Sequence, residues 1–409
     1  MTVHLLKSKI KTKNSIQITG SKSESNRLLL LKALYPEVKI ENLSNSDDSQ
    51  LMQKALSSND ELIDIHHAGT AMRFLTAYFS IQEGRNTILT GSSRMKERPI
   101  SILVDALRDL GADIEYIENE GFPPLRIKGR PLPKSSTTLK ANVSSQYISA
   151  LLLIASKLKN GLELTLDGKI TSVPYINMTL QLLKQIEIET KFADQKITVM
   201  PKISGVKSQS MVVESDWSSA SYFYSIVALS DLGTEIQLSA YKEDSLQGDS
   251  VLSNIYKRFG VTTEYGENKI ILRKSETISS EAEPINLDLS NAPDIAQTIA
   301  VTVYGLDLTC HLTGLHTLKI KETDRLVALK TELEKLGGTI EITDNSLKVL
   351  KSGTPAPNVA IDTYRDHRMA LAFAPLALTR DISINDAYVV SKSYPDFWTD
   401  LQKLGITVK

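Results

Sequence analysis

A helical run of apolar residues that ends at a small residue and leads into an alternating strand recurs along this chain. In residues 103–110 the apolar side chains recur at helical spacing, Gly111 follows, and residues 113–116 alternate between polar and apolar. A glycine after the last helical residue, followed by alternation of period two, is typical of a joint between a helix and a strand. The same joint is centred at positions 111, 186, 260, 337 and 405, and a weaker copy lies near residues 55–65.

The joints are evenly spaced, with 68 to 77 residues between neighbouring positions from 111 to 405. This period is longer than the roughly 20–50 residues of a solenoid repeat. Helix-to-strand joints occur in any α/β protein, but their even spacing favours true repetition. The pattern therefore predicts an α/β (α+β) protein of roughly six units, each with two helices and several strands.

Ser, Asn or Asp precedes several of the predicted helices. These residues accept hydrogen bonds from the first backbone N–H groups of a helix, so they mark helix starts. Asp324 and Asp366 are interpreted first as such caps and only second as acids of a site. The predicted helices are residues 28–34, 148–158, 218–229, 295–303, 326–336 and 369–378, and they follow Ser25-Asn26, Ser144-Ser145, Asp216, Asp294, Asp324 and Asp366.

Seven short stretches of basic or hydroxyl residues lie at or just before predicted helix starts. The whole chain has 47 basic and 48 acidic residues and a net charge of −1, so cations are not a general property of its surface. A helix N-terminus already favours anions through its unpaired N–H groups and its dipole. Arginines and lysines at several such ends predict a pocket for a substrate with several negative charges. The stretches are residues 22–27, 68–73, 94–99, 144–146, 321–325, 365–369 and 392–395.

The sequence also narrows the kind of chemistry. A single cysteine, Cys310, excludes a disulfide scaffold and a cysteine-based metal site. His66 and His67 are adjacent and have no carboxylate partner at ligand spacing, so we expect no metal site there. The sequence contains no P-loop, no dinucleotide fingerprint and no G-x-S-x-G signature. A site rich in Arg and Lys with a few carboxylates suits phosphate-bearing substrates, and the acids would move protons.

Composition and apolar runs indicate where the protein acts. Its 409 residues suggest two or three domains. The first 20 residues lack the apolar region of a secretory signal, and the longest apolar runs, such as residues 369–378, are far shorter than the ~20 residues that span a bilayer. Near-zero net charge and 6% aromatic residues argue against a nucleic-acid partner. We therefore expect a cytoplasmic protein with no nucleic-acid or membrane partner.

Ten motifs follow one another in the order of a known family. They are Gly20-Ser21-Lys22-Ser23 with Arg27, Ala68-Gly69-Thr70-Ala71-Met72-Arg73, Arg94 to Arg98-Pro99, Ser144-Ser145-Gln146, Ser172-Val173-Pro174-Tyr175, Glu214-Ser215-Asp216 with Ser218-Ser219-Ala220, Pro293-Asp294, Lys321 to Arg325, Asp366 to Met369, and Lys392-Ser393-Tyr394-Pro395. Over nearly its full length, the chain resembles the 5-enolpyruvylshikimate-3-phosphate (EPSP) synthases, or 3-phosphoshikimate 1-carboxyvinyltransferases.

The resemblance implies a fold and a division into domains. The family has two similar domains, each built from three βαβαββ units, with the active site in the interdomain cleft. Its chain crosses between the domains twice. We therefore expect residues 1–20 and 214–409 to form one domain and residues 21–213 to form the other.

The resemblance also implies a reaction without cofactor or metal, carried out by a monomer. The 5-hydroxyl of shikimate 3-phosphate attacks the enol carbon of phosphoenolpyruvate, the methylene carbon is protonated, and the resulting intermediate loses phosphate. Asp294 is then the base near the 5-hydroxyl, Glu322 takes part in proton transfer to the methylene, and Lys22 touches both substrates, as does Gln146. Shikimate 3-phosphate is expected at Ser23, Arg27, Ser144, Ser145, Ser172 and Lys321, and phosphoenolpyruvate at Gly69, Arg98, Arg325, Arg368 and Lys392.

Four positions depart from the family pattern. His67 stands where the family usually has Asn, Thr317 where a substrate-contacting Asn is common, and Thr19 where Pro is common. Phe74 stands where Pro or Leu is frequent. Gly69 matches the form of the family that the herbicide glyphosate inhibits, because a side chain there would crowd the phosphoenolpyruvate site. The resemblance thus predicts inhibition by glyphosate, competitive with phosphoenolpyruvate.

Three other readings remain open from the sequence. The UDP-N-acetylglucosamine enolpyruvyl transferases share the fold, but they generally carry a reactive cysteine in the half that holds Arg98, and Cys310 lies elsewhere. A non-catalytic anion-binding relative would have lost the acids, yet Asp294, Glu322 and Lys22 are all present. A nucleic-acid-end-modifying enzyme with similar repeats conflicts with the neutral charge of the chain.

Overall fold

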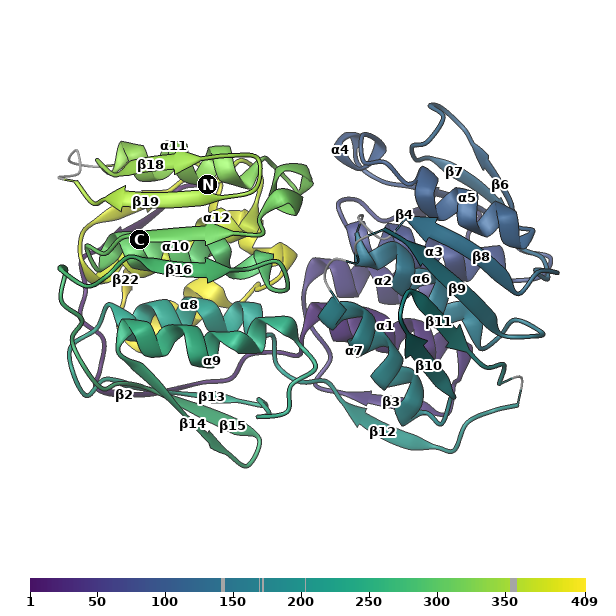
Figure 1. The fold of residues 1–409 in the computed structure, drawn as a ribbon, viewed down its shortest axis with the longest axis horizontal. Helices are drawn as coiled ribbons and strands as arrows, with labels where there is room; N and C mark the ends of the chain where they lie inside the picture. The colour runs from purple at the N-terminus through teal and green to yellow at the C-terminus, as the bar shows by residue number, and fades with distance from the viewer. Residues whose placement is uncertain (141–143, 169, 171–172, 203, 354–358) are drawn as a thin grey trace. The chain divides into compact units, whose positions relative to one another are not determined.

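The chain forms two compact units. The computed structural model describes all residues except 141–143, 169, 171–172, 203 and 354–358. Unit 1 consists of Met1–Thr19 and Glu214–Lys409, and unit 2 consists of Gly20–Val213. The expected boundary after residue 20 thus lies one residue later than the observed division. Both termini belong to unit 1, as the chain ends marked in Figure 1 show.

The four-stranded sheets follow one strand order. In unit 1, β16 (Ile285–Asp288) pairs parallel with β17 (Cys310–Thr313), β17 pairs antiparallel with β19 (Leu347–Lys351), and β19 pairs antiparallel with β18 (Thr339–Ile342). The chain therefore makes a crossover between the first two strands and ends in a hairpin, which is the βαβαββ unit. Three further sheets have this order. One, in unit 1, is β2 (Lys13–Ile16), β13 (Glu235–Ser239), β15 (Lys269–Lys274) and β14 (Val261–Gly266). The two in unit 2 are β4 (Leu62–Asp64), β5 (Asn86–Thr90), β7 (Leu125–Lys128) and β6 (Asp113–Tyr116), and β8 (Ser136–Lys140), β9 (Leu162–Asp167), β11 (Lys196–Val199) and β10 (Thr190–Ala193).

The last sheet of unit 1 is completed by the first strand of the chain. Its order is β20 (Ala360–Ile361), β21 (Ile382–Ile384), β1 (Val3–Leu6) and β22 (Thr407–Val408). β1 occupies the place that the fourth strand takes in the other sheets, so the N-terminal segment finishes a unit that the C-terminal segment begins. In unit 2, β3 (Val38–Glu41) and β12 (Gln209–Val212) form a parallel two-stranded sheet, the sixth sheet among the described residues.

The helix-to-strand joints lie where the sequence predicts them. Gly111, Gly260, Gly337 and Gly405 have φ angles of 109°, 74°, 88° and 106°, the left-handed region in which glycine has no steric cost. At the joint near position 186 the left-handed residue is Glu187, with φ 61°. All five joints lead into the third strand of a sheet. Near residues 55–65 a helix, α2 (Asp47–Ser57), also leads into a strand, but this joint differs from the other five because β4 is a first strand that pairs in parallel with β5.

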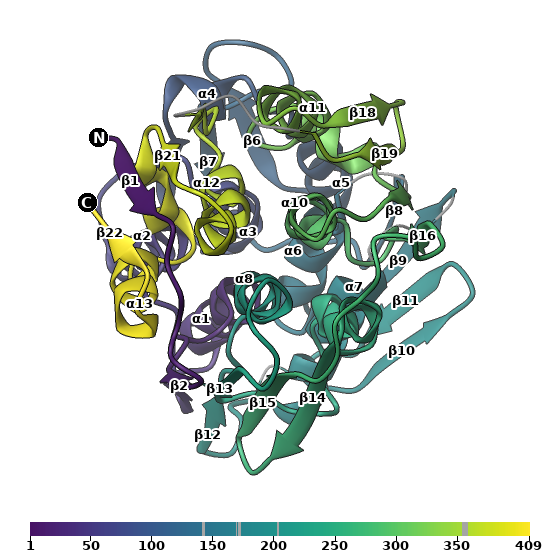
Figure 2. The same ribbon diagram turned by 90° about the vertical axis from the view of Figure 1, so that its left-hand side faces the viewer.

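Buried helices form the centre of each unit. In unit 1, α8 (Trp217–Ala228), α10 (Ala296–Gly305) and α12 (His367–Phe373) lie in the middle, and the three sheets surround them (Figure 2). Because these helices are buried on nearly all sides, their hydroxyl groups bond to each other, as when Thr302 Oγ1 donates to Ser225 Oγ at 2.8 Å. In unit 2, the buried helices are α1 (Lys22–Leu34), α3 (Gly69–Ser80) and α6 (Ser145–Ala155).

The remaining helical segments are shorter or lie nearer the surface. In the described part of the chain, no helix combines the length and the apolar character that a bilayer span requires. The α-helices are α2 (Asp47–Ser57), α4 (Ser93–Lys96), α5 (Ser101–Leu110), α7 (Val173–Gln185), α9 (Leu252–Ile255), α11 (Arg325–Lys335) and α13 (Phe397–Leu404); the 3₁₀ segments are η1 (Gly248–Val251), η2 (Tyr256–Phe259), η3 (Pro293–Ile295), η4 (His316–Ile320), η5 (Ala374–Leu378) and η6 (Ala387–Lys392).

Acidic caps begin three of the helices in unit 1. The carboxylates of Asp216, Asp324 and Asp366 accept backbone N–H bonds at the starts of α8, α11 and α12, as predicted. Asp294 is not a cap, because it lies inside η3 and α10 begins at Ala296.

Two of the basic stretches also lie differently from the prediction. α1 begins at Lys22, so Lys22 and Ser23 belong to its first turn and not to a preceding loop. Lys392 ends η6, so its stretch follows one helical segment and comes before another. Ser21 and Asp386 stand before α1 and η6, but neither side chain accepts a helix N–H, so these two starts lack the cap bond that marks the starts of α8, α11 and α12.

Candidate active site

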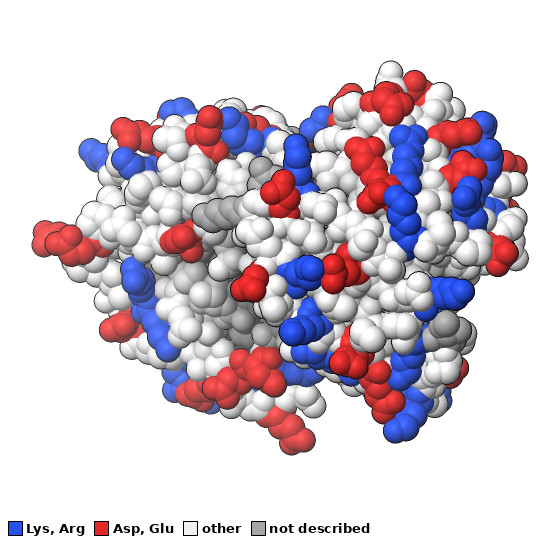
Figure 3. All heavy atoms as spheres, turned by 45° about the vertical axis from the view of Figure 1, so that its right-hand side comes forward, with Lys and Arg blue, Asp and Glu red and all other residues white. Residues whose placement is uncertain are grey.

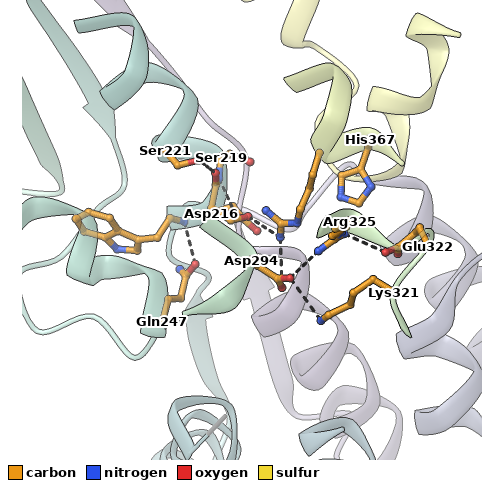
Figure 4. A network of polar contacts seen from close by, with 12 residues as sticks. Asp216, Ser219, Ser221, Gln247, Asp294, Lys321, Glu322, Arg325 and His367 are labelled. Carbon is orange, nitrogen blue, oxygen red and sulfur yellow. Dashed lines mark hydrogen bonds and ion pairs between the residues drawn. The ribbon is translucent and has the colours of Figure 1, made fainter. Parts of the chain in front are cut away.

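Arg325 is the centre of a buried ionic cluster in unit 1. It is the first residue of α11 and is only 2% exposed. Its Nε atom donates to Asp366 Oδ2 at 2.7 Å, Nη1 to Asp294 Oδ1 at 2.8 Å, and Nη2 to Glu322 Oε2 at 2.9 Å. Figure 4 shows Arg325 between Asp294 and Glu322. Three carboxylates around one guanidinium raise the pKa of Arg325 even though burial lowers it, so this cation stays charged.

Asp294 faces several cations. Besides Arg325, Lys321 Nζ lies 3.4 Å from Asp294 Oδ1, and Arg368 Nη2 lies 3.6 Å from Oδ2. Burial raises the pKa of Asp294, but Lys321, Arg368 and Arg325 lower it by more, so the pKa lies well below its usual range. The carboxylate is therefore ionised and weakly basic while these cations are close to it.

Glu322 joins the loop before α11 to η6. Its Oε1 atom accepts a hydrogen bond from Lys392 Nζ at 2.6 Å, while its Oε2 atom faces Arg325. Lys392 lies 70 positions away in sequence, and only the tertiary structure brings the two together. A lysine and an arginine thus share one carboxylate.

Arg368 is held from a different helix. Asp216, the cap of α8, accepts from the hydroxyl of Ser218, and Ser218 Oγ in turn accepts from Arg368 Nη2 at 3.2 Å. Arg368 Nη1 donates to the hydroxyl oxygen of Tyr222 at 3.5 Å. This chain of contacts aims the guanidinium at Asp294, so a helix cap positions a site cation indirectly.

Asp249 is an acid of this cluster that the sequence analysis missed. It lies in η1 with 5% of its surface exposed, and no donor among the described residues reaches its buried Oδ1 atom. The pKa of Asp249 is raised to about 7, because burial and the charge of Asp294 raise it by more than Arg368 lowers it. Its only sequence signal is a polar run, Gln247-Gly248-Asp249, which looks like any loop before a helix.

In unit 2, Arg27 is buried among the helices. Its Nε atom donates to Thr179 Oγ1 at 2.7 Å, Nη1 to the backbone oxygen of Ser23 at 2.7 Å, and Nη2 to Ser149 Oγ at 2.9 Å. Burial lowers the pKa of Arg27 to about 10. The side chain thus ties α1 to α6 and α7, and the half-buried Lys22 and Ser23 occupy the first turn of the same helix.

Gly69, Arg98 and Gln146 lie close together in unit 2. A Cβ atom placed on Gly69 would lie 2.6 Å from Arg98 Nη1, so the guanidinium rests against the start of α3. Gln146 Nε2 donates to Thr70 Oγ1 at 3.2 Å, and the hydroxyl of Tyr147 donates to the backbone oxygen of Pro99 at 2.6 Å. These bonds hold the Arg98 segment and the starts of α3 and α6 in one group.

The other predicted residues are placed as follows. Ser144 caps α6, its Oγ atom accepting from the Gln146 N–H, and buried Ser145 is the first residue of that helix. His67 Nδ1 and Ser92 Oγ lie 2.7 Å apart, so the departure at His67 has a local partner. The hydroxyl of Thr317 is buried and reaches no partner within the described residues. Ser172 lies outside the described residues.

The surface has mixed charge. On the face shown in Figure 3, basic and acidic side chains are interspersed, which fits the net charge of −1. The cations of the cluster are instead buried with carboxylates, so the concentration of charge belongs to the sites and not to the surface.

Known proteins are similar to this chain in sequence. A family model described as EPSP synthase (3-phosphoshikimate 1-carboxyvinyltransferase) matches residues 56–401. A 3-phosphoshikimate 1-carboxyvinyltransferase of Bacteroides fragilis (strain YCH46) is 50% identical, covering 99% of this chain and 98% of that protein. The chain belongs to the EPSP synthase family. The 3-phosphoshikimate 1-carboxyvinyltransferase of Vibrio cholerae serotype O1 (strain M66-2) is 36% identical over 95% of this chain and 96% of its own length.

Solved structures have the same fold. An EPSP synthase of Acinetobacter baumannii superposes with a TM-score of 0.82 at 20% identity, covering 100% of this chain and 99% of that one. The enolpyruvyl transferase NikO of Streptomyces tendae gives a TM-score of 0.75 at 15% identity, with 100% and 98% covered. The predicted family and fold class are confirmed, and the EPSP synthase family makes this chain a transferase.

Proposed function

We propose that the described clusters carry out the reaction of the EPSP synthase family, in the shikimate pathway of aromatic amino acid biosynthesis. The enolpyruvyl group of phosphoenolpyruvate passes to the 5-hydroxyl of shikimate 3-phosphate, and phosphate is released. The observation that supports this most is the cluster of Arg325, Lys321 and Arg368 around Asp294. Each substrate carries a carboxylate and a phosphate, and these are the anions that such cations bind.

The substrate ligands that we propose are those implied by the family resemblance. We assign shikimate 3-phosphate to hydroxyl groups and cations at or near the starts of α1, α6, α7 and α11. Phosphoenolpyruvate is assigned to the glycine that begins α3 and to cations just before α5, at the starts of α11 and α12 and at the end of η6. The shikimate 3-phosphate ligands are Ser23, Arg27, Ser144, Ser145, Ser172 and Lys321; the phosphoenolpyruvate ligands are Gly69, Arg98, Arg325, Arg368 and Lys392; and Lys22 and Gln146 touch both.

Asp294 is the proposed base, and substrate binding strengthens it. In the substrate-free protein, Lys321, Arg368 and Arg325 hold its pKa low, which makes it a poor proton acceptor. When substrate anions pair with Lys321 and Arg368, those cations stabilise the carboxylate of Asp294 less, so its pKa rises. Proton removal from the 5-hydroxyl is thereby coupled to the presence of the substrates.

Glu322 is the proposed partner in protonation of the methylene carbon. The 5-oxygen forms a bond to the enol carbon as its proton passes to Asp294, and the methylene carbon receives a proton by way of Glu322. As the C–O bond to phosphate breaks, the methyl carbon returns a proton to Glu322 and the double bond is restored, while the released phosphate takes up the proton held by Asp294. Lys392, 2.6 Å from Glu322, stabilises the carboxylate between the two proton transfers.

The reactive cysteine of the rival transferases acting on a UDP-sugar has no counterpart in Cys310. Cys310 is buried in β17, and burial raises the pKa of its thiol to about 12, so it is not a reactive thiolate. A binding-only relative would not need Asp294 and Glu322 arranged among cations.

We also propose that the protein acts in the cytoplasm as a monomer, without a nucleic-acid partner. The near-neutral chain and the mixed surface charge support this. Light scattering on a sizing column checks the monomer, and a mass near 45.2 kDa is expected.

The deciding experiment is phosphate release from purified protein. We expect release only when shikimate 3-phosphate and phosphoenolpyruvate are both present. Controls contain each substrate alone, and phosphoenolpyruvate with UDP-N-acetylglucosamine. Release with the UDP-sugar would identify the rival transferase, and substrate binding without release would identify a non-catalytic relative.

A further inference from the structure

A strained turn precedes α12 in unit 1. The backbone oxygen of Thr363 accepts from the Asp366 N–H at 2.8 Å, which closes a four-residue turn. Its two central residues, Tyr364 and Arg365, have φ angles of 53° and 58°. Positive φ at both positions defines a type I′ turn, which favours Asn and Gly. Tyrosine and arginine are unfavourable in this conformation, so contacts elsewhere must hold it.

A buried glutamate in α11 provides such a contact. Glu332 is fully buried, and its Oε1 atom accepts from the hydroxyl of Tyr364. Its Oε2 atom accepts from the Asp362 N–H at 3.2 Å and lies 2.9 Å from Lys335 Nζ. The residues on both sides of Thr363 are therefore fastened to one carboxylate.

The residue that ends the turn also contacts α11. Asp366 follows Arg365 directly, and its carboxylate accepts from Arg325 Nε at 2.7 Å. Arg325 begins α11, and Glu332 lies about two turns further along the same helix. Asp366 Oδ1 also accepts from the Arg368 N–H at 2.9 Å, which sets the first turn of α12. A relaxed turn would therefore displace the partner of one site arginine and the backbone of another.

We propose that Tyr364 is a positioning residue for the active site. Its hydroxyl, bonded to Glu332, holds the left-handed turn in the conformation that places Asp366 and Arg368. This inference rests on the proposed function, in which Arg325 and Arg368 bind phosphoenolpyruvate. Burial and the bond to Glu332 raise the pKa of Tyr364, so the hydroxyl stays protonated and can donate.

A double-mutant cycle separates positioning from a merely structural role. Tyr364→Phe removes the hydroxyl but keeps the ring, which is 37% exposed. Arg365→Gly makes a left-handed φ favourable at the second central position without any help from Tyr364. We expect Tyr364→Phe to lower kcat/KM for phosphoenolpyruvate roughly tenfold to a hundredfold, mainly through KM, since small misplacements of binding groups have effects of this size. In a protein that already carries Arg365→Gly, Tyr364→Phe should lower kcat/KM for phosphoenolpyruvate by less than about threefold.

Tyr265→Phe is the matched control, because Tyr265 lies in β14 and is similarly exposed at 36%. Kinetic constants should not change there. Two results would overturn the inference: kinetic constants of Tyr364→Phe within twofold of the original protein, or equal losses in both backgrounds. If the hydroxyl had a merely structural role, its removal in Tyr364→Phe would lower the melting temperature and leave KM at 25 °C unaltered.

Hydrogen exchange provides a readout that does not depend on the reaction. The Arg368 amide donates to Asp366, so its exchange should accelerate in Tyr364→Phe and slow again in the double variant. If the original protein released no phosphate, the proposed function would fail, and the exchange rate would still decide whether Tyr364 holds the turn. Unaltered exchange in Tyr364→Phe would refute the positioning role.

Discussion

At the scale of residues, the chemistry depends on which charges are buried together. Arg325 has three carboxylate partners, and Asp294 is shared by three cations. Removing one partner from such a cluster leaves an uncompensated buried charge, which is costly. Lys321 and Lys392 add positive charge beside the carboxylates, and we expect substrate anions to pair with these cations while Arg325 keeps its carboxylate partners.

The assigned base gives the first prediction. Asp294→Ala and Lys22→Ala should each lower kcat by about 10²–10⁴-fold, because acid–base and positioning groups contribute on that scale. Stopped-flow or coupled phosphate assays measure kcat, and circular dichroism checks the fold. Asp231→Ala, which removes an exposed acid paired with Lys9, should change kcat by less than twofold. Full activity in either site variant would contradict the assigned roles.

Asp249 gives a prediction about pH. Its pKa is about 7 in the folded protein and roughly 3.9 in the unfolded chain. Between these values the folded chain keeps a proton that the unfolded chain has released, so this group makes stability fall as pH rises from about 4 to 7. Asp249→Asn removes the effect. The free energy of unfolding of the variant minus that of the original protein, measured in urea, should be about 2–4 kcal/mol more positive at pH 8 than at pH 4.5. A constant difference at both pH values would count against the raised pKa.

Gly69 gives a prediction about inhibitors. The methyl group of Gly69→Ala would displace the Arg98 guanidinium, which a flexible side chain tolerates, so the fold should survive. A weakened charge-assisted contact is worth about 1.5–3 kcal/mol, so KM for phosphoenolpyruvate should rise about tenfold to a hundredfold. Inhibition by glyphosate should weaken in parallel, while kcat changes little. Gly84→Ala, with open space around its Cβ position, is a control for glycine replacement, although its positive φ lowers stability slightly. Unaltered KM in Gly69→Ala would show that Arg98 does not bind this substrate.

At the scale of elements, the residues at helix N-termini both cap the helices and position side chains of the site. Asp324 and Asp366 are both caps in unit 1, but only Asp366 also bonds to Arg325. Comparing the two residues therefore separates the effect of losing a helix cap from the effect of losing the bond to Arg325. A cap replaced by alanine costs about 0.5–2 kcal/mol.

We therefore expect different outcomes for the two caps. Asp324→Ala should lower stability by about 1 kcal/mol and leave kcat within a few fold. Asp366→Ala should lose the cap and also remove one of the three carboxylate partners of buried Arg325, so its loss of stability should exceed that of Asp324→Ala, and it should lower kcat/KM for phosphoenolpyruvate strongly. Urea unfolding and steady-state kinetics measure both. Equal effects of the two changes would mean that the Arg325–Asp366 pair does not matter for the site.

At the scale of the whole molecule, the two ends of the chain complete one sheet. β1 pairs with β21 on one side and with β22 on the other, so residues nearly 400 positions apart are neighbours. Unit 1 therefore cannot finish folding until both ends of the chain are present. In sequence, its two segments flank Gly20–Val213, which forms the other compact unit.

Leu5 tests that closure. It is 1% exposed in the middle of this sheet, and Leu5→Ala should destabilise unit 1 by about 2–5 kcal/mol through lost burial and a cavity. Leu62→Ala is the same chemical change at a leucine that is 60% exposed, and it should cost less than about 0.5 kcal/mol. Thermal unfolding followed by circular dichroism compares them. Similar melting temperatures for the two variants would show that β1 contributes little to unit 1.

The sequence by itself determined the features that depend on neighbouring residues. Glycines at 111, 260, 337 and 405 marked the joints, because a left-handed residue after a helix is costly for side chains with a Cβ atom. Caps such as Asp324 were visible because a carboxylate reaches N–H groups only two or three positions ahead. The ordered motifs identified the family and hence the fold.

The tertiary structure alone decided what depends on distant residues. Glu187 takes a left-handed φ where the sequence shows no glycine, and Asp249 joins the site from a loop that has no local signal. Arg325 meets Asp366 across 41 positions, and Lys392 meets Glu322 across 70. Local sterics act along the chain and can be inferred from it, whereas the pairing of buried charges depends on how the crossovers fold the chain back on itself.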